Sequence, residues 1–159
     1  MFNEATINAG LFKQIYENMV VTNLIVEYNL GRESTGYHHD LCNDSANVDY
    51  TQAVFGGITA TNNGIISNCK VKGQATLSAS SVEQAINDDS IAFNMAGLVG
   101  TNATTGRITN SASELKMTAK ANIAGVVCTN QGKIASTYFD ANKDKGKIYA
   151  YNNNITVPY

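Results

Sequence analysis

The segment richest in side chains that could do chemistry is His-His-Asp-Leu-Cys-Asn-Asp at residues 38–44. Imidazole, thiolate and carboxylate groups are all ligands that a transition metal accepts. His38 and His39 are the only histidines of the chain. Adjacent side chains in an extended segment point to opposite faces, so these two imidazoles are poorly placed to bind one ion. A polar surface loop explains the segment better, and we predict no metal ligands.

Other kinds of catalytic site have less support. The chain contains no HExxH helix motif, no GxSxG nucleophile elbow and no Walker or Rossmann glycine motif. Its three cysteines are widely spaced, which is typical of buried small side chains and not of a zinc site or disulfide framework. The remaining acidic candidates share no position in the repeat described below: Glu83, Asp88, Asp89 and Glu114. We therefore expect no enzyme activity, no catalytic residue and no cofactor.

Composition narrows the possible partners. The chain has 159 residues, a net charge of −2 and only 15% charged residues, against about 25% in an average globular domain. Lys and Arg are scattered, so no basic stripe is available to neutralise a row of phosphates. No apolar run approaches the roughly 20 residues of a membrane span. We expect neither nucleic-acid binding nor a membrane span.

Most of the chain follows a repeated sequence pattern. Four segments share a small residue, a glycine and then apolar residues, and their glycines are Gly10, Gly57, Gly97 and Gly125. In three copies an asparagine lies five residues after the glycine, at Asn62, Asn102 and Asn130. A short β-prone run follows in every copy, and one of its columns contains Asn23, Asn68, Asn110 and Ser136. Such column-by-column agreement is typical of a solenoid.

The short strands and turns select the architecture. No helical period persists, and one unit cannot bury its apolar face unless it stacks in parallel on an equivalent unit. We predict an all-β, right-handed parallel β-helix of about four coils, in which Val21, Ile66, Ile108 and Ile134 share one buried row. The column of Asn23 should adopt left-handed backbone and form an amide ladder. The repeated glycines should serve either positive φ angles or close approach of coils. Hairpins of a β-sandwich are the alternative.

The organisation that follows is a single β-solenoid over residues 1–159, interrupted by two longer loops at 31–50 and 78–93. Its ends lack a capping signature, so we expect either a fragment of a longer protein or a chain whose ends are buried against partners. The predicted repeat units lie near 8–30, 54–77, 94–120 and 122–140.

The repeat resembles a known family. Gly97-Leu98-Val99-Gly100, then Asn102 and Gly106-Arg107-Ile108-Thr109-Asn110, is similar to the GLUG repeat of bacterial surface proteins. The segment from Gly10 to Leu24 looks like the related unit in the N-terminal regions of streptococcal IgA-specific metallopeptidases. The resemblance covers roughly residues 8–140. It implies a parallel β-helix in a secreted or wall-attached bacterial protein, and it brings no catalytic residues with it.

The function expected from these observations is a non-catalytic structural and adhesive surface module, acting as a stalk or displaying a ligand-contact loop. The candidate contact residues in loop 31–50 are Tyr37, His38, His39 and Tyr50, because long insertions on a rigid scaffold often carry function. Expected partners are a host glycan, a host surface protein and flanking domains of the same chain. We expect an extracellular or cell wall-attached location, with the signal outside this fragment.

One alternative is a glycan- or host-protein-binding module. Another is a substrate-positioning segment of a large secreted metallopeptidase, which an HExxH motif elsewhere in the reading frame would favour.

Overall fold

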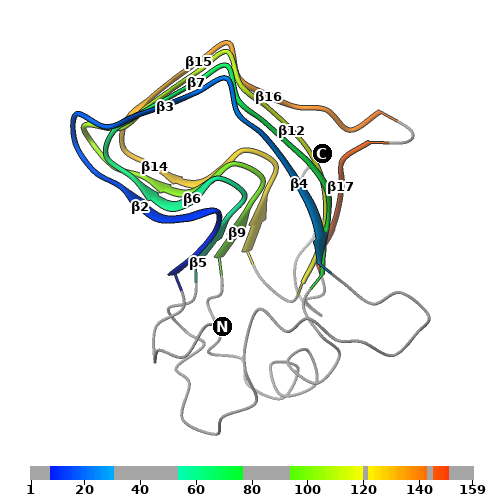
Figure 1. The fold of residues 1–159 in the computed structure, drawn as a ribbon. Coiled ribbons are helices and arrows are strands. Elements are labelled where there is room, and N and C mark those ends of the chain that lie inside the picture. Colours follow the sequence, from blue (N-terminus) through cyan, green and yellow to red (C-terminus); the bar gives the residue numbers. More distant parts are fainter. Residues whose placement is uncertain (1–7, 31–53, 77–93, 120–121, 143–144, 151–159) are drawn as a thin grey trace, which may run out of the picture.

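The fold was analysed in a computed structural model that describes residues 8–30, 54–76, 94–119, 122–142 and 145–150. These residues form seventeen strands and no helix. Figure 1 shows four coils lying over one another, each following the same angular path. The predicted insertions at 31–50 and 78–93 lie outside the described residues, as do the candidate contact residues within the first of them.

Each coil contributes four strands. Coil 1 contains β1 (Asn8–Ala9), β2 (Phe12–Ile15), β3 (Val20–Thr22) and β4 (Ile25–Leu30). Coil 2 contains β5 (Val54–Gly56), β6 (Thr59–Asn62), β7 (Ile65–Ser67) and β8 (Lys70–Thr76). Coil 3 contains β9 (Asn94–Ala96), β10 (Val99–Asn102), β11 (Arg107–Thr109) and β12 (Ala112–Ala119). Coil 4 contains β13 (Asn122–Ala124), β14 (Val127–Asn130), β15 (Lys133–Ala135), β16 (Tyr138–Phe139) and the additional β17 (Lys147–Ala150).

Equivalent strands pair in parallel and form four sheets. Sheet 1 has the order β1-β5-β9-β13, sheet 2 β2-β6-β10-β14 and sheet 3 β3-β7-β11-β15. Sheet 4 has the order β4-β8-β12-β16, and β17 also pairs with β12. Among the described residues, every strand pairing is parallel and in register along the axis, as between β7 and β11. The parallel β-helix of four coils predicted from the repeat is confirmed.

The apolar core consists of rows that run along the axis. Val21, Ile66, Ile108 and Ile134 are in register, as predicted. Ile66 and Ile108 have no exposed surface, whereas the Ile134 side chain in coil 4 is 38% exposed. The prediction that the whole row is buried was therefore wrong at its end. A row residue loses water on both sides only when a coil lies above and below it.

The repeated glycines serve close approach between coils. A Cβ built on Gly57 would lie 2.2 Å from the Gly97 carbonyl oxygen, and one on Gly97 would lie 2.1 Å from the Gly125 carbonyl oxygen. Their φ angles are not positive, because Gly73 is the only described glycine in the left-handed region. Two reasons were predicted for this glycine column, positive φ angles and close approach of coils. The structure shows the second.

Left-handed backbone occurs instead in the predicted asparagine column, at the corner between sheets 3 and 4. Its four members have positive φ angles: Asn23 57°, Asn68 54°, Asn110 48° and Ser136 49°. In coils 2 to 4 the next side chain donates a hydrogen bond across the corner to the carbonyl two residues earlier. These donors are Cys69, Ser111 and Thr137. The corner is thus held by one backbone conformation and one short hydrogen bond.

Candidate functional site

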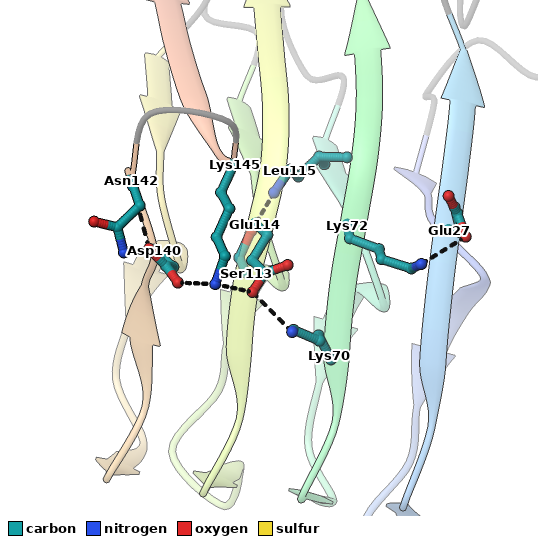
Figure 2. Close-up of polar contacts among 9 residues, drawn as sticks. All are labelled: Glu27, Lys70, Lys72, Ser113, Glu114, Leu115, Asp140, Asn142 and Lys145. Carbon is teal, nitrogen blue, oxygen red and sulfur yellow. Dashed lines mark hydrogen bonds and ion pairs between the residues drawn. The ribbon is translucent and has the colours of Figure 1, made fainter.

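Among the described residues, the largest group of interacting charged side chains lies on the outer face of sheet 4 (Figure 2). Glu27 of β4, Lys72 of β8 and Glu114 of β12 are in register, so they form one row along the axis. The Lys72 ammonium lies 2.8 Å from the Glu27 carboxylate. The Lys70 ammonium lies 2.7 Å from the Glu114 carboxylate. Alternating positions along each strand point outward, and register brings opposite charges of neighbouring coils together.

Coil 4 completes the row by means of an insertion. β16 pairs with the start of β12, and β17 pairs with its second half. Lys145 lies between β16 and β17, and Figure 2 shows its side chain reaching back to β12. Its ammonium lies 2.6 Å from the Asp140 carboxylate and 3.0 Å from the Glu114 carboxylate. Lys145 therefore bridges the two acidic side chains.

These contacts determine the ionisation of the carboxylates. Hydrogen bonds from Lys70 and then Lys145 lower the pKa of Glu114. A hydrogen bond from Lys145, followed by one from the Asn142 backbone, lowers the pKa of Asp140. A general acid needs a pKa raised toward the working pH. Both carboxylates are shifted the other way, so this cluster is suited to ion pairing and not to proton transfer.

A shallow hollow of about 380 Å³ lies over this cluster, bordered by Glu27, Lys72, Glu114 and Lys145. Tyr28 lies beneath it and points inward. Its hydroxyl donates a 2.8 Å hydrogen bond to the Gly57 carbonyl, and burial raises its pKa to about 12. The phenol is thus a structural hydrogen-bond donor with no accessible phenolate at neutral pH.

A second surface follows the corner between sheets 3 and 4. The hollow there measures about 350 Å³ and includes Asn23, Asn68, Asn110, Lys70 and Tyr138. The Asn68 amide donates to the Asn23 side-chain oxygen, so part of the predicted amide ladder is present. We refer to this surface as the asparagine groove.

Tyr138 borders this groove, and the contact residues predicted from the sequence do not include it. Its side chain is 57% exposed. It follows the corner residue Ser136 by two positions, as Ile25 follows Asn23 in coil 1. The repeat alignment already gave the position of Tyr138 relative to the corner. Only the stacking of coils shows that its ring lies beside the corner amides.

The cysteines differ in burial and neither described one is poised for reaction. Cys69 is 3% exposed and belongs to the core. Cys128 is half-buried, and its thiol donates a 3.1 Å hydrogen bond to the Met95 carbonyl. Burial raises the pKa of the Cys128 thiol to about 11. The thiolate is the reactive form, so a raised pKa disfavours reaction of Cys128 near neutral pH.

Within the described ranges, no group of three or more His, Cys, Asp or Glu side chains is placed to hold a metal ion. The same residues include no helix long and apolar enough to cross a membrane. The candidate contact residues Tyr37, His38, His39 and Tyr50 lie outside the described part, so their role stays a prediction.

Comparison with known proteins returned no match to a family model, to a curated protein or to a solved structure. The resemblance to GLUG repeats therefore stays a prediction.

Proposed function

We propose that this chain is a non-catalytic structural and adhesive module of a bacterial extracellular protein, acting as a stalk or as a scaffold that displays a ligand-binding surface. The observation that carries the proposal is the in-register stacking of four coils along one axis. Such stacking makes a quasi-one-dimensional body whose length grows with the number of coils.

The hydrogen bonds of this stack favour a stiff spacer. Backbone bonds run from coil to coil, as from the Ile58 amide to the Leu98 carbonyl at 2.7 Å. A row of side-chain amides, buried at Asn62 and Asn102, reinforces them: Asn62 donates to Asn102, and Asn102 donates to Asn130, each at 2.8 Å. Adjacent coils of a parallel sheet lie about 4.8 Å apart. Both sets of bonds resist separation of the coils along the axis.

The charged surfaces support a non-catalytic role. Nucleophilic and general-acid groups need an activating partner or a raised pKa. Glu114 and Asp140 instead carry lowered pKa values and bridging lysines, and the Cys128 pKa is raised. The directions of these three shifts disfavour a role in general-acid or nucleophilic catalysis.

A labelling experiment tests the extracellular role. Antibodies raised against the purified chain should stain intact cells of the source organism, or detect the protein in the medium. An antibody against a cytoplasmic protein is the control, since it should stain only after the cells are opened. Staining by both antibodies only after lysis would overturn the proposal.

Glycan binding is a second candidate, favoured by the asparagine groove. Exposed amides beside an exposed aromatic ring are groups that hydrogen-bond to sugar hydroxyls and stack on a sugar ring. Asn110 and Tyr138 supply these groups, and Lys70 adds a hydrogen-bond donor.

Paired tyrosine variants test glycan binding. Tyr138→Ala should abolish retention of the chain on a glycan array, whereas Tyr16→Ala should not. Tyr16 is a matched control because its side chain is 60% exposed, against 57% for Tyr138, and it does not border the groove. An array without any retained glycan, or equal loss in both variants, would leave only the stalk.

A further inference from the structure

The two ends of the described stack expose residues whose row equivalents are fully buried. Ile58 and Leu98 have no exposed surface, but Leu11, the equivalent residue of coil 1, is 49% exposed. Thr59 and Val99 are likewise fully buried, and Phe12 in the same row is 39% exposed. At the other end Ile134 is 38% exposed. Apolar rows therefore stop abruptly at coil 1 and coil 4.

Backbone pairing stops at the same places. The described strands of coil 1 and the strands β13 to β16 each stand at the end of their sheet order. Edge strands present unpaired N–H and C=O groups that can pair with another chain. Both ends thus combine strand edges with incomplete apolar rows.

We propose that coil 4 of one copy of this chain stacks on coil 1 of a second copy, so that the solenoid continues head-to-tail. Each row then extends by one member of its own kind: Ile134 meets Val21 of the next copy, and Val127 meets Phe12. The new strand pairs are parallel and keep the register already present between coils 3 and 4. This inference goes beyond the proposed function, because it requires no ligand.

The outline of the coil favours this arrangement over coil 1 meeting coil 1. The four sides of coil 1 have 2, 4, 3 and 6 residues in chain order. A twofold axis through the sides of 4 and 6 residues would leave those two sides facing themselves, but it would exchange the sides of 2 and 3 residues and make every strand pair antiparallel. A head-to-tail contact keeps the direction of the chain around the outline and superposes every side on its equivalent.

Charge favours the same contact. The described residues of coil 1 contain one lysine and two glutamates, a net charge of −1. Those of coil 4 contain Lys133, Asp140, Lys145 and Lys147, a net charge of +2. Asp140 is already paired with Lys145. Lys147 continues the row of Lys116, Gln74 and Asn29, so it would lie beside Asn29 of the next copy and near Glu27 on the same outer face.

Two blocking variants separate the alternatives in sedimentation experiments on the full chain. The wild type should form a series of oligomers whose mean mass rises with concentration. Leu11→Glu should block the coil 1 end and Ile134→Glu the coil 4 end, and each variant alone should sediment as a monomer. An equimolar mixture of the two should form dimers, because each supplies one intact end. Ile65→Glu is the control, since Ile65 is 37% exposed on the flank of coil 2 and should leave association unchanged.

Other outcomes would overturn the proposal. If Ile134→Glu alone still dimerises while Leu11→Glu does not, coil 1 meets coil 1. If the wild type stays monomeric at every concentration, the ends do not bind each other.

Cysteine cross-linking gives a readout that does not depend on the stability of the blocking variants. Thr22, Ser67, Thr109 and Ala135 occupy one row, and both Thr22 and Ala135 are exposed. A head-to-tail junction brings Ala135 beside Thr22 at the spacing of paired strands, within disulfide range. Mixed Thr22→Cys and Ala135→Cys proteins should form a heterodimeric disulfide under mild oxidation. Cross-linking no greater than that of Ser67→Cys mixed with Ala135→Cys would contradict the junction.

Discussion

Asparagine forms two rows along the solenoid, one inside and one outside, and the two rows exist for different reasons. Asn62 and Asn102 lie in the inner row with no exposed surface, and each amide hydrogen-bonds to the next coil. Asn23, Asn68 and Asn110 lie in the outer row, where all three have positive φ angles. The inner row needs a side chain that both donates and accepts. The outer row needs a residue that tolerates left-handed backbone. Asparagine therefore recurs in this repeat for two separate reasons, side-chain hydrogen bonding in the inner row and backbone conformation in the outer row.

Removing the inner amide should have the largest effect. Asn102→Leu leaves the Asn62 amide and the Asn130 side-chain oxygen without their partner. An unsatisfied buried polar group costs about 1–3 kcal/mol, and Asn62 is buried whereas Asn130 is exposed to water, so we expect the free energy of unfolding to fall by about 2–3 kcal/mol, mainly through Asn62. Urea unfolding followed by circular dichroism measures the change. Asn102→Gly should be equally damaging, and a fully stable Asn102→Gly protein would remove the distinction between the rows.

A smaller loss of stability is expected in the glycine column, where the coils need space and not hydrogen bonds. Gly97→Ala places a Cβ about 2.1 Å from the Gly125 carbonyl oxygen, so the backbone of one coil must shift. Overpacking of this kind costs about 1–3 kcal/mol. Thermal unfolding should show a lower midpoint than the wild type. An unchanged midpoint would mean that the coils separate without cost at this column.

Substitution by glycine should be tolerated in the outer row, in contrast to the inner row. Asn68→Ala keeps a Cβ in left-handed backbone with φ 54° but removes the short polar side chain that lets Asn tolerate this conformation, which costs about 1 kcal/mol. Asn68→Gly removes that strain and should be close to the wild type in the same urea experiment. Loss of the exposed hydrogen bond to Asn23 adds little, because water replaces it. If both substitutions destabilise equally, the outer row depends on its amides and not on its backbone.

The outer ion pairs of sheet 4 should give the smallest and most pH-dependent effect. The pKa values of Glu114 and Asp140 are lowered in the folded chain from ordinary values of 4.5 and 3.8. A carboxylate with a lowered folded pKa stabilises the fold above its unfolded pKa, and this stabilisation is lost as the pH falls through the folded value.

Lys145→Gln tests that dependence through the unfolding midpoint. The variant should be slightly less stable than the wild type at pH 7, and the difference should shrink as the pH falls below about 4.5. Lys133→Gln is the control, because Lys133 belongs to none of the ion pairs among the described residues. A difference that is constant from pH 7 to pH 3 would show that Lys145 acts through packing alone.

Some contacts could not be read from the repeat for physical reasons. The bridge from Lys145 to Glu114 depends on an insertion within coil 4 that has no counterpart in the other repeat units. The ladder of Asn62, Asn102 and Asn130, of which the first two are buried, was visible only as a recurring residue, since inside and outside alternate along each strand. The candidate contact loop at residues 31–50 lies outside the described part and stays a prediction.

The amino-acid sequence by itself determined the strand units, the parallel stacking and the membership of the main rows, because each coil must place like residues over like to bury its apolar side. It also determined the left-handed corner at Asn23, Asn68 and Asn110, since that conformation is a local backbone preference. Only the tertiary structure decided which asparagines are buried, which charges meet across sheet 4 and which row members stay exposed at the ends. Those properties depend on what lies in the coil above or below, and a residue's own neighbours along the chain do not specify it.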